Sequence, residues 1–217
     1  NNNNPLLEPE IQKTFEVGTE LRFNHNRISV DATYYNTKND KLIVENFRAS
    51  YATGYVLNTL NVGANQNQGV EVAINMDIIS NTNFKWNSRI NFNKMWNEVT
   101  ELPANVPEFY ISDTWLYANA RGGLVLGGQT TTITSYGYKR NNEGVILINP
   151  TTGLPQLDNN FRVRGDRNPD FTIGFANTYF YKAFRFSMLW DLKVGGDIFN
   201  ATDMYLTRNG RSYRTID

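Results

Sequence analysis

The stretch GVEVAINMDIISNTNFKWNSRINFN, residues 69–93, decides the fold. From residue 70 to residue 78 every second residue is apolar, and most of the residues between them are Glu, Asn or Asp. This period of two predicts a β-strand with one apolar face. After the turn-forming run at 80–83 the alternation restarts and continues to residue 93, which predicts a hairpin. Each arm is about ten residues long, the length that a tilted strand needs to cross a bilayer.

Two further hairpins repeat this pattern. Apolar residues alternate on both sides of a turn at 24–26 and on both sides of a turn at 181–183. We therefore expect three hairpins, joined or followed by three long connections. The hairpins are predicted at about residues 12–36, 69–94 and 170–195, and the connections at about 37–68, 95–169 and 196–217.

The lengths of the connections indicate the class of fold. The turns within hairpins are short, whereas the connections between hairpins run to tens of residues, so all the long loops must leave the sheet at one end. This arrangement is typical of outer-membrane barrels, with short periplasmic turns and long extracellular loops. We predict an all-β fold, an antiparallel transmembrane β-barrel segment. The smallest such barrels have about eight strands, so the predicted strands form only part of a wall.

Composition excludes several other classes of protein. The 217 residues include 21 basic and 21 acidic side chains, so a nucleic-acid-binding surface, which needs an excess of basic residues, is not expected. The chain has no cysteine, which excludes disulfides and thiolate metal sites. Its apolar runs are far shorter than the roughly twenty residues of a transmembrane helix. It opens on Asn1 without a signal-peptide pattern, as expected of a processed chain or an internal piece.

Alternation also sorts the strand residues into two faces. Charge on a lipid-facing side would cost a few kcal/mol per residue near the midplane, so the apolar face is predicted to contact membrane lipid. Its predicted lipid-facing residues are Phe15, Val17, Leu21, Phe23, Val72, Ile74, Met76, Trp86, Phe186, Met188 and Trp190. The other face carries both signs of charge, closely interspersed, and is predicted to line the lumen. Its residues are Glu16, Glu20, Arg22, Asp31, Glu71, Asp77, Arg89, Arg185, Asp191 and Lys193.

Aromatic residues in the long loops are the only hint of a ligand site. An aromatic ring can stack on the apolar face of a sugar while neighbouring Asn, Asp and Thr side chains bond its hydroxyls. Packing of the loops against one another, or against a lid protein, would use the same residues. The predicted ligand-binding residues are Tyr51, Tyr55, Phe109, Tyr110, Trp115 and Tyr117.

No catalytic residue, metal site or cofactor is predicted, and the chain is not expected to be an enzyme. Asp166, Asn168 and Asp170 have the opening spacing of a calcium loop, but Phe171 stands where that loop needs glycine. We expect a turn there in which Asp and Asn side chains bond their own backbone. His25, the single histidine, lies between two asparagines in a predicted turn and is expected to be solvated.

A series of short segments lies in order along the chain, at the predicted boundaries between strands and loops. They are LEPEIQKTFEVG at 7–18, ATYYNTK at 32–38, NQGVE at 67–71, YGY at 136–138, TGLP at 152–155, GDRNPDF at 165–171 and GGDIFN at 195–200. Together they cover nearly the whole chain, and the chain resembles the C-terminal part of the β-barrel domain of SusC/RagA-like TonB-dependent outer-membrane transporters.

The resemblance implies a barrel of twenty-two strands filled by a plug domain. It implies active import of oligosaccharides or peptides across the Gram-negative outer membrane, driven by TonB, under a SusD-like surface lipoprotein. The expected partners are therefore that lipoprotein, TonB, the protein's own plug domain, an oligosaccharide or peptide substrate, and membrane lipid. This sequence shows neither a plug nor a TonB-contacting segment, and it ends on TID at 215–217, so the piece alone is not expected to transport anything.

Two other functions remain open at this point. A soluble carbohydrate-binding β-sandwich would use the same apolar face as its core. A passive porin or adhesin barrel would share the wall but lack the plug and the coupling to TonB.

Overall fold

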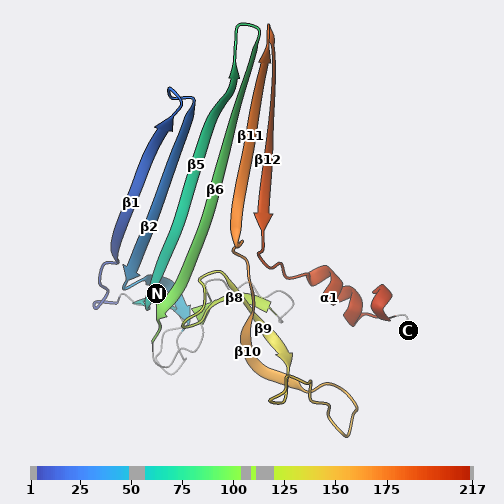
Figure 1. Ribbon diagram of the computed structural model, residues 1–217. Coiled ribbons are helices and arrows are strands. Elements are labelled where there is room, and N and C mark those ends of the chain that lie inside the picture. Colours follow the sequence, from blue (N-terminus) through green and yellow to red (C-terminus); the bar gives the residue numbers. More distant parts are fainter. Residues whose placement is uncertain (1–3, 49–56, 104–108, 111–119, 216–217) are drawn as a thin grey trace. The chain divides into compact units, whose positions relative to one another are not determined.

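The computed structural model describes residues 4–48, 57–103, 109–110 and 120–215. The chain divides into two compact units, one at 1–107 with 169–195 and the other at 108–168 with 196–217. The first unit contains an antiparallel six-stranded sheet in the order β1-β2-β5-β6-β11-β12 (Figure 1). Its strands are β1 (Ile11–Phe23), β2 (Ile28–Asp40), β5 (Ala64–Ser80), β6 (Phe84–Glu101), β11 (Phe171–Tyr181) and β12 (Phe184–Val194).

The three short turns lie at one end of this sheet, and the long connections leave from the other (Figure 1). We call these the turn end and the loop end. In the β1–β2 turn Asn24, His25 and Asn26 have φ of 50°, 55° and 66°, a left-handed conformation in which Asn is enriched. Lys182, with φ 51°, makes the β11–β12 turn. These turns bring each strand back beside its predecessor, as the alternation predicted.

The register keeps one set of apolar side chains on one face across all six strands. Leu21 pairs with Val30, Val30 with Ile74 and Ile74 with Ile90, and the row continues through Phe175 to Trp190. Directly paired residues of an antiparallel sheet point to the same side. The alternation in each strand therefore adds up to one continuous apolar face.

A β-bulge near the turn end corrects one detail of the predicted pattern. Asp77 pairs with Asn87, but Ile79 pairs with Trp86, so Ile78 is the extra residue. The Arg27 guanidinium donates hydrogen bonds to the carbonyl oxygens of Asp77 and Ile78 at 2.9 and 2.8 Å. It thereby occupies carbonyl groups at the bulge, and Ile79 takes the place in the apolar row that simple alternation gives to Ile78.

Within the described residues of the first unit, no second layer covers the apolar face. Val72 and Ile74 are half-buried by their neighbours, whereas Phe186 and Trp190 are 62% and 66% exposed. A soluble sandwich would bury these side chains against another sheet. Their exposure is therefore contrary to the β-sandwich alternative.

The connection after β2 is tied to the start of the chain. It forms the small hairpin of β3 (Ile43–Arg48) and β4 (Leu57–Asn61). The Asn61 side chain accepts a hydrogen bond from the Glu8 backbone N–H at 2.8 Å and donates to the carbonyls of Glu8 and Lys41. The side-chain amide of Asn61 thus joins three segments at the loop end.

The second unit shows that the expected loops at 95–169 and 196–217 contain regular structure. Its sheet has the order β10-β9-β8-β7, formed by β7 (Phe109–Tyr110), β8 (Ala120–Leu124), β9 (Thr132–Tyr138) and β10 (Leu157–Asp166). Ala120, Ile133 and Thr134 are buried in it. The helix α1 (Ala201–Arg208) begins at Asn200, whose side chain accepts a hydrogen bond from the Asp203 N–H, and a 3-10 turn follows at Tyr213–Thr215.

Residues 139–156 form a compact arm between β9 and β10. Arg140 bridges to Ile146 and Ile148 bridges to Pro155. The side chains of Asn141 and Asn149 each accept a hydrogen bond from a backbone N–H two residues further on, as in Asx turns. In the described residues no helix has both the length and the apolar character needed to cross a membrane.

Gly69 provides a test of the packing in the six-stranded sheet. A Cβ atom at Gly69 would lie 2.4 Å from the ring of Tyr35, its direct partner on β2. We expect Gly69→Ala in the full-length protein to lower the free energy of unfolding by about 1–3 kcal/mol, measured by urea unfolding in detergent micelles.

Gly174→Ala is the matched control, because its Cβ would meet only Asn91 Nδ2 at 3.7 Å, an ordinary contact. Equal stability of the Gly69→Ala protein and the wild type would show that the Tyr35 ring does not occupy that position.

Candidate functional site

The candidate site is the polar face of the six-stranded sheet. The register places all ten residues predicted to line a lumen on this face and all eleven residues predicted to contact lipid on the other. One row illustrates the polar face: Glu20 pairs with Asp31, and the row runs through Ala73, Asn91 and Gly174 to Asp191. Pairing alone establishes which residues share a face.

The charges on this face are segregated, not interspersed as the sequence suggested. On β1, β2 and β5 the acidic residues outnumber the basic ones. On β6 up to residue 97 and on β12, which lie on the two sides of β11, the basic residues outnumber the acidic ones. The acidic set is Glu16, Glu20, Asp31, Glu71 and Asp77, with Arg22 as the basic exception. The basic set is Lys85, Arg89, Arg185 and Lys193, with Asp191 as the acidic exception.

This segregation gives the polar face an electric polarity across the strands. A group with opposite charges at its two ends would be oriented by it, since each end is attracted to one half of the face. Within the acidic half, Arg22 forms an ion pair with Glu20, and both side chains are exposed.

A shallow pocket of about 350 Å³ lies where the two halves meet. Asp31 and Glu71 line it from the acidic half, and Arg89, Asn91 and Asn93 line it from β6. Asn93 Nδ2 donates to Glu71 Oε1 at 3.1 Å, and Arg89 Nε donates to Asn91 Oδ1 at 3.1 Å. The pocket therefore presents carboxylates, a guanidinium and amides together, a set that can bind hydroxyl, amide or charged groups.

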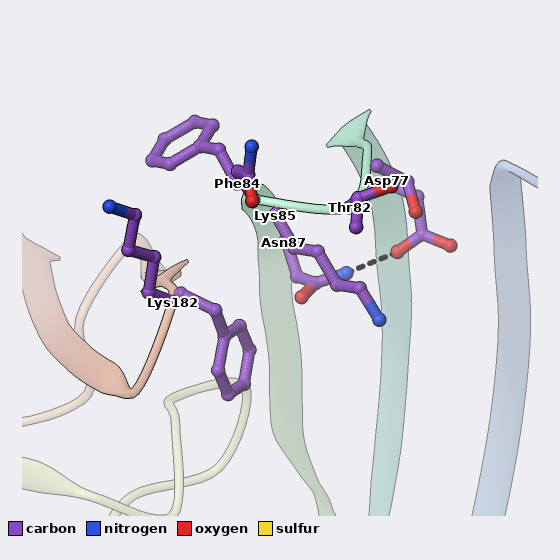
Figure 2. Close-up of a pocket in the computed structure, with 9 residues that line it drawn as sticks. Asp77, Thr82, Phe84, Lys85, Asn87 and Lys182 are labelled. Carbon is purple, nitrogen blue, oxygen red and sulfur yellow. Dashed lines mark hydrogen bonds between the residues drawn. The ribbon is translucent and has the colours of Figure 1, made fainter.

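A second pocket of about 520 Å³ lies at the turn end. Figure 2 shows Asp77, Lys85 and Asn87 beside it, with Lys182 on the β11–β12 turn. Asn87 Nδ2 donates a hydrogen bond to Asp77 Oδ1, which is drawn as a dashed line in Figure 2. Sequence reasoning selected Asp77 by its charge, but missed Lys85 and Asn87 as parts of a shared site because only strand pairing brings them beside it.

Three large side chains interrupt the polar face. The Tyr35 ring lies over Gly69, and the Arg185 guanidinium lies 5.4 Å from the centre of the Phe180 ring. Leu189 is 70% exposed there. Leu189 pairs with the small Ala176 and stays exposed, so this position offers an apolar contact to whatever occupies the space beside it.

The apolar face has a polar exception of its own. Ser88 and Asn177 are directly paired on it and are only 4% and 1% exposed. Trp86 Nε1 donates to Asn177 Oδ1 at 2.9 Å. Trp86 also stacks against Tyr179, with ring centres 5.5 Å apart. The indole N–H is therefore satisfied by a side chain of the neighbouring strand.

The predicted ligand-binding aromatics remain predictions. Tyr51, Tyr55, Trp115 and Tyr117 lie outside the described residues. The backbones of Phe109 and Tyr110 form β7, which pairs with Leu124 and Gly123 of β8. Asp166, considered for a calcium loop, accepts a hydrogen bond from the Asn168 N–H, which confirms the expected turn.

In the second unit one carboxylate has a shifted pKa. Asp158 is buried and accepts a hydrogen bond from the Asn160 backbone N–H at 3.1 Å, and Arg162 Nε donates to it at 2.8 Å. The backbone hydrogen bond and the guanidinium hold the pKa of Asp158 below its ordinary value. The stabilisation from this carboxylate is thus present above its unfolded-state pKa and is lost as the pH falls through the lowered value.

Comparison with known proteins places this geometry in a family. The profile described as TonB dependent receptor-like, beta-barrel matches residues 1–201. The chain belongs to this family. Its members are outer-membrane β-barrels that act as transporters and not as enzymes, so the six-stranded sheet is a segment of such a barrel.

Curated relatives agree with this assignment. TonB-dependent receptor P3 of Formosa agariphila is 27% identical over 233 residues, which cover 99% of this chain and 23% of that protein. TonB-dependent receptor SusC of Bacteroides thetaiotaomicron is 28% identical over 183 residues, which cover 82% of this chain and 17% of that protein. The chain thus spans less than a quarter of the length of these relatives.

Solved structures share the fold. The RagAB peptide importer in its closed-closed state matches with a TM-score of 0.67 and 19% identity, covering 89% of this chain and 22% of that chain. The structure of the RagAB peptide transporter matches with a TM-score of 0.64 and 17% identity, covering 86% and 21%. At this level of identity the likeness concerns the fold alone.

The hydrogen bond between Trp86 and Asn177 can be tested directly. We expect Asn177→Ala in the full-length protein to lower the free energy of unfolding by about 1–3 kcal/mol, because the buried indole N–H loses its acceptor. Trp86→Phe should lower the free energy of unfolding by less in the Asn177→Ala protein than in the wild type. A double-mutant cycle from urea unfolding in micelles would measure this difference.

Asn87→Ala is the control, since it removes an exposed amide from the opposite face. A coupling near zero between Trp86 and Asn177 would contradict the assigned bond.

Proposed function

We propose that this chain forms part of the barrel wall of an active, TonB-dependent importer of oligosaccharides or peptides. The observation that carries the proposal is the division of one sheet into a bare apolar face and a charged, pocketed face. Membership of the family supports the same function. The sheet supplies six strands of the wall.

In this proposal the apolar face contacts lipid and the polar face lines the lumen. The ten charged residues predicted to line the lumen share the polar face with Lys85. Each would cost about 2–4 kcal/mol if an Arg or Lys faced lipid at the midplane, and somewhat less for Asp or Glu. Facing water or a plug domain removes that cost. The reverse orientation would also place Phe186 and Trp190 in water.

The substrate class follows from the chemistry of the polar face. Amides, carboxylates and guanidinium groups around the two pockets suit a ligand that is rich in hydroxyl or amide groups. A peptide also carries opposite charges at its ends, which the segregated face would orient. The structural likeness to RagAB, whose name describes a peptide importer, supports the peptide alternative.

The proposed partners lie on both sides of the wall. The protein's own plug domain would fill the lumen against the polar face, with the exposed Leu189 as one contact. TonB would act through an N-terminal region. A SusD-like surface lipoprotein would dock on the long connections, and the arm at 139–156 exposes Val145, Ile148 and Leu154 as apolar contacts.

The orientation of the faces can be tested with two neighbouring residues. Ile74 and Asn75 are adjacent on β5 and point to opposite faces. We expect Ile74→Arg in the full-length protein to reduce the free energy of folding into lipid vesicles by about 2–4 kcal/mol, whereas Asn75→Arg should change it by less than about 1 kcal/mol. Denaturant titration of the reconstituted protein measures both, and equal costs would contradict the orientation.

Import can be tested in cells that carry the full-length gene and in cells that lack it. We expect the gene to confer uptake of a labelled oligosaccharide mixture or a labelled oligopeptide mixture. A protonophore should abolish this uptake, because coupling through TonB requires the proton gradient. Uptake that survives the protonophore would favour the passive porin alternative, and a lack of uptake of both mixtures would contradict import.

A further inference from the structure

A band of polar residues interrupts the apolar face near its loop end. Lys13 of β1 pairs with Lys38 of β2, Lys38 with Gln66 of β5, and the next row contains Asn36 and Gln68. Lys94 of β6 pairs with Val70 and completes the group. We call this group the lysine belt; it consists of Lys13, Asn36, Lys38, Gln66, Gln68 and Lys94. It lies on the same face as Phe15 and Val72, just beyond the apolar rows.

The central feature of the belt is an opposed pair of like charges. Lys13 and Lys38 are direct cross-strand partners and both are exposed. Like charges directly opposite each other destabilise a sheet. Among the described residues neither ammonium group has an ion-pair or hydrogen-bond partner. No ion pair among the described residues therefore compensates the repulsion, and an anion held between the two groups would relieve it.

Two carboxylates share this face but do not neutralise the pair. Asp40 pairs with Ile11, one row further towards the loops than the lysines. Glu98 pairs with Gln66 in the same row as the lysines, two strands from Lys38 and three from Lys13. Neither makes an ion pair with Lys13 or Lys38 in the described structure. The nearby Glu8 is already paired with Lys41.

Hydrogen bonds and a ring contact hold the other side chains of the belt. Gln66 Nε2 donates to Asn36 Oδ1 at 2.9 Å, and the Tyr34 hydroxyl donates to Gln68 Oε1 at 3.1 Å. Lys94 Nζ lies 5.1 Å from the centre of the Trp96 ring. Fixed amides and an aromatic ring beside ammonium groups match a ligand that carries phosphate and polar oxygens, next to acyl chains that contact the apolar rows.

We propose that the lysine belt binds the phosphate groups of anionic lipids in the leaflet on the loop side of the membrane. The position of the belt follows from the register: apolar rows lie on its turn side, and the long connections lie on its other side (Figure 1). Headgroups occupy that level in a bilayer. The proposal rests on the lipid-facing orientation of the apolar face, but not on any substrate.

The test uses the full-length protein in detergent micelles and a bisphosphorylated disaccharide lipid as the probe. Native mass spectrometry measures its binding to the wild type and to the double variant Lys13→Gln/Lys38→Gln. We expect the double variant to bind about tenfold more weakly or worse, because charge-assisted contacts to phosphate are lost. The same lipid without its phosphates should bind weakly to both proteins.

Two control variants show whether a loss of lipid binding is specific to Lys13 and Lys38. Lys182→Gln removes a lysine at the turn end, and Lys41→Gln removes one already paired with Glu8, so both should bind the probe like the wild type. Urea unfolding confirms that each variant is folded. Equal binding by the double variant and the wild type, or an equal loss in Lys182→Gln, would overturn the proposal.

Two further measurements distinguish a lipid phosphate from free phosphate as the ligand and test which face of the sheet contacts lipid. Millimolar inorganic phosphate should not displace the lipid, and displacement would assign the belt to free phosphate and overturn the lipid proposal. If Ile74→Arg did not reduce the free energy of folding into vesicles, the proposed orientation of the faces would be rejected. Intact orientation together with unchanged lipid binding in the double variant would reject the lysine belt alone.

Discussion

The structure depends on one constraint, that alternate side chains of six strands stay in phase across the whole sheet. A shift of one residue in any pair would move a full set of apolar side chains to the charged face. The turns set this phase at one end, with Asn24, His25 and Asn26 in left-handed conformations. At the single bulge of the turn end, Arg27 binds the carbonyls of Asp77 and Ile78. The bulge absorbs one extra isoleucine without inverting the rest of β5.

The two faces of the sheet differ in how many polar side chains they carry and in what those side chains contact. On the apolar face Asn177 accepts the Trp86 N–H, and Gln66 and Asn36 bond each other near the loop end. The buried Asn177 Nδ2 and Ser88 Oγ have no hydrogen-bond partner among the described residues. The polar face, in contrast, leaves its carboxylates and guanidinium groups available beside two shallow pockets. Segregation of charge between its halves is a property of strand order, because β5 and β6 are neighbours at the change of sign.

The segments outside the six-stranded sheet are held by local hydrogen bonds. Asn61 links Glu8 to Lys41, Asn141 and Asn149 close the turns of the arm, and Asn200 caps α1. Short polar side chains that bond nearby backbone groups can hold such segments where little apolar surface is buried. The exposed apolar residues of the arm then remain available for contact with another protein.

The sequence by itself determined the hairpins, the division of residues between two faces and the family, because a period of two and short turns are local properties. It did not reveal that β5 and β6 run to Ala64 and Glu101 or that β7, β8, β9 and β10 form a second sheet, since those strands lack clear alternation. Only the tertiary structure placed Lys13 opposite Lys38, Asn177 beside Trp86 and the acidic strands apart from the basic ones. These relations join residues up to 91 positions apart, and pairing between strands, which no local pattern encodes, brings them together.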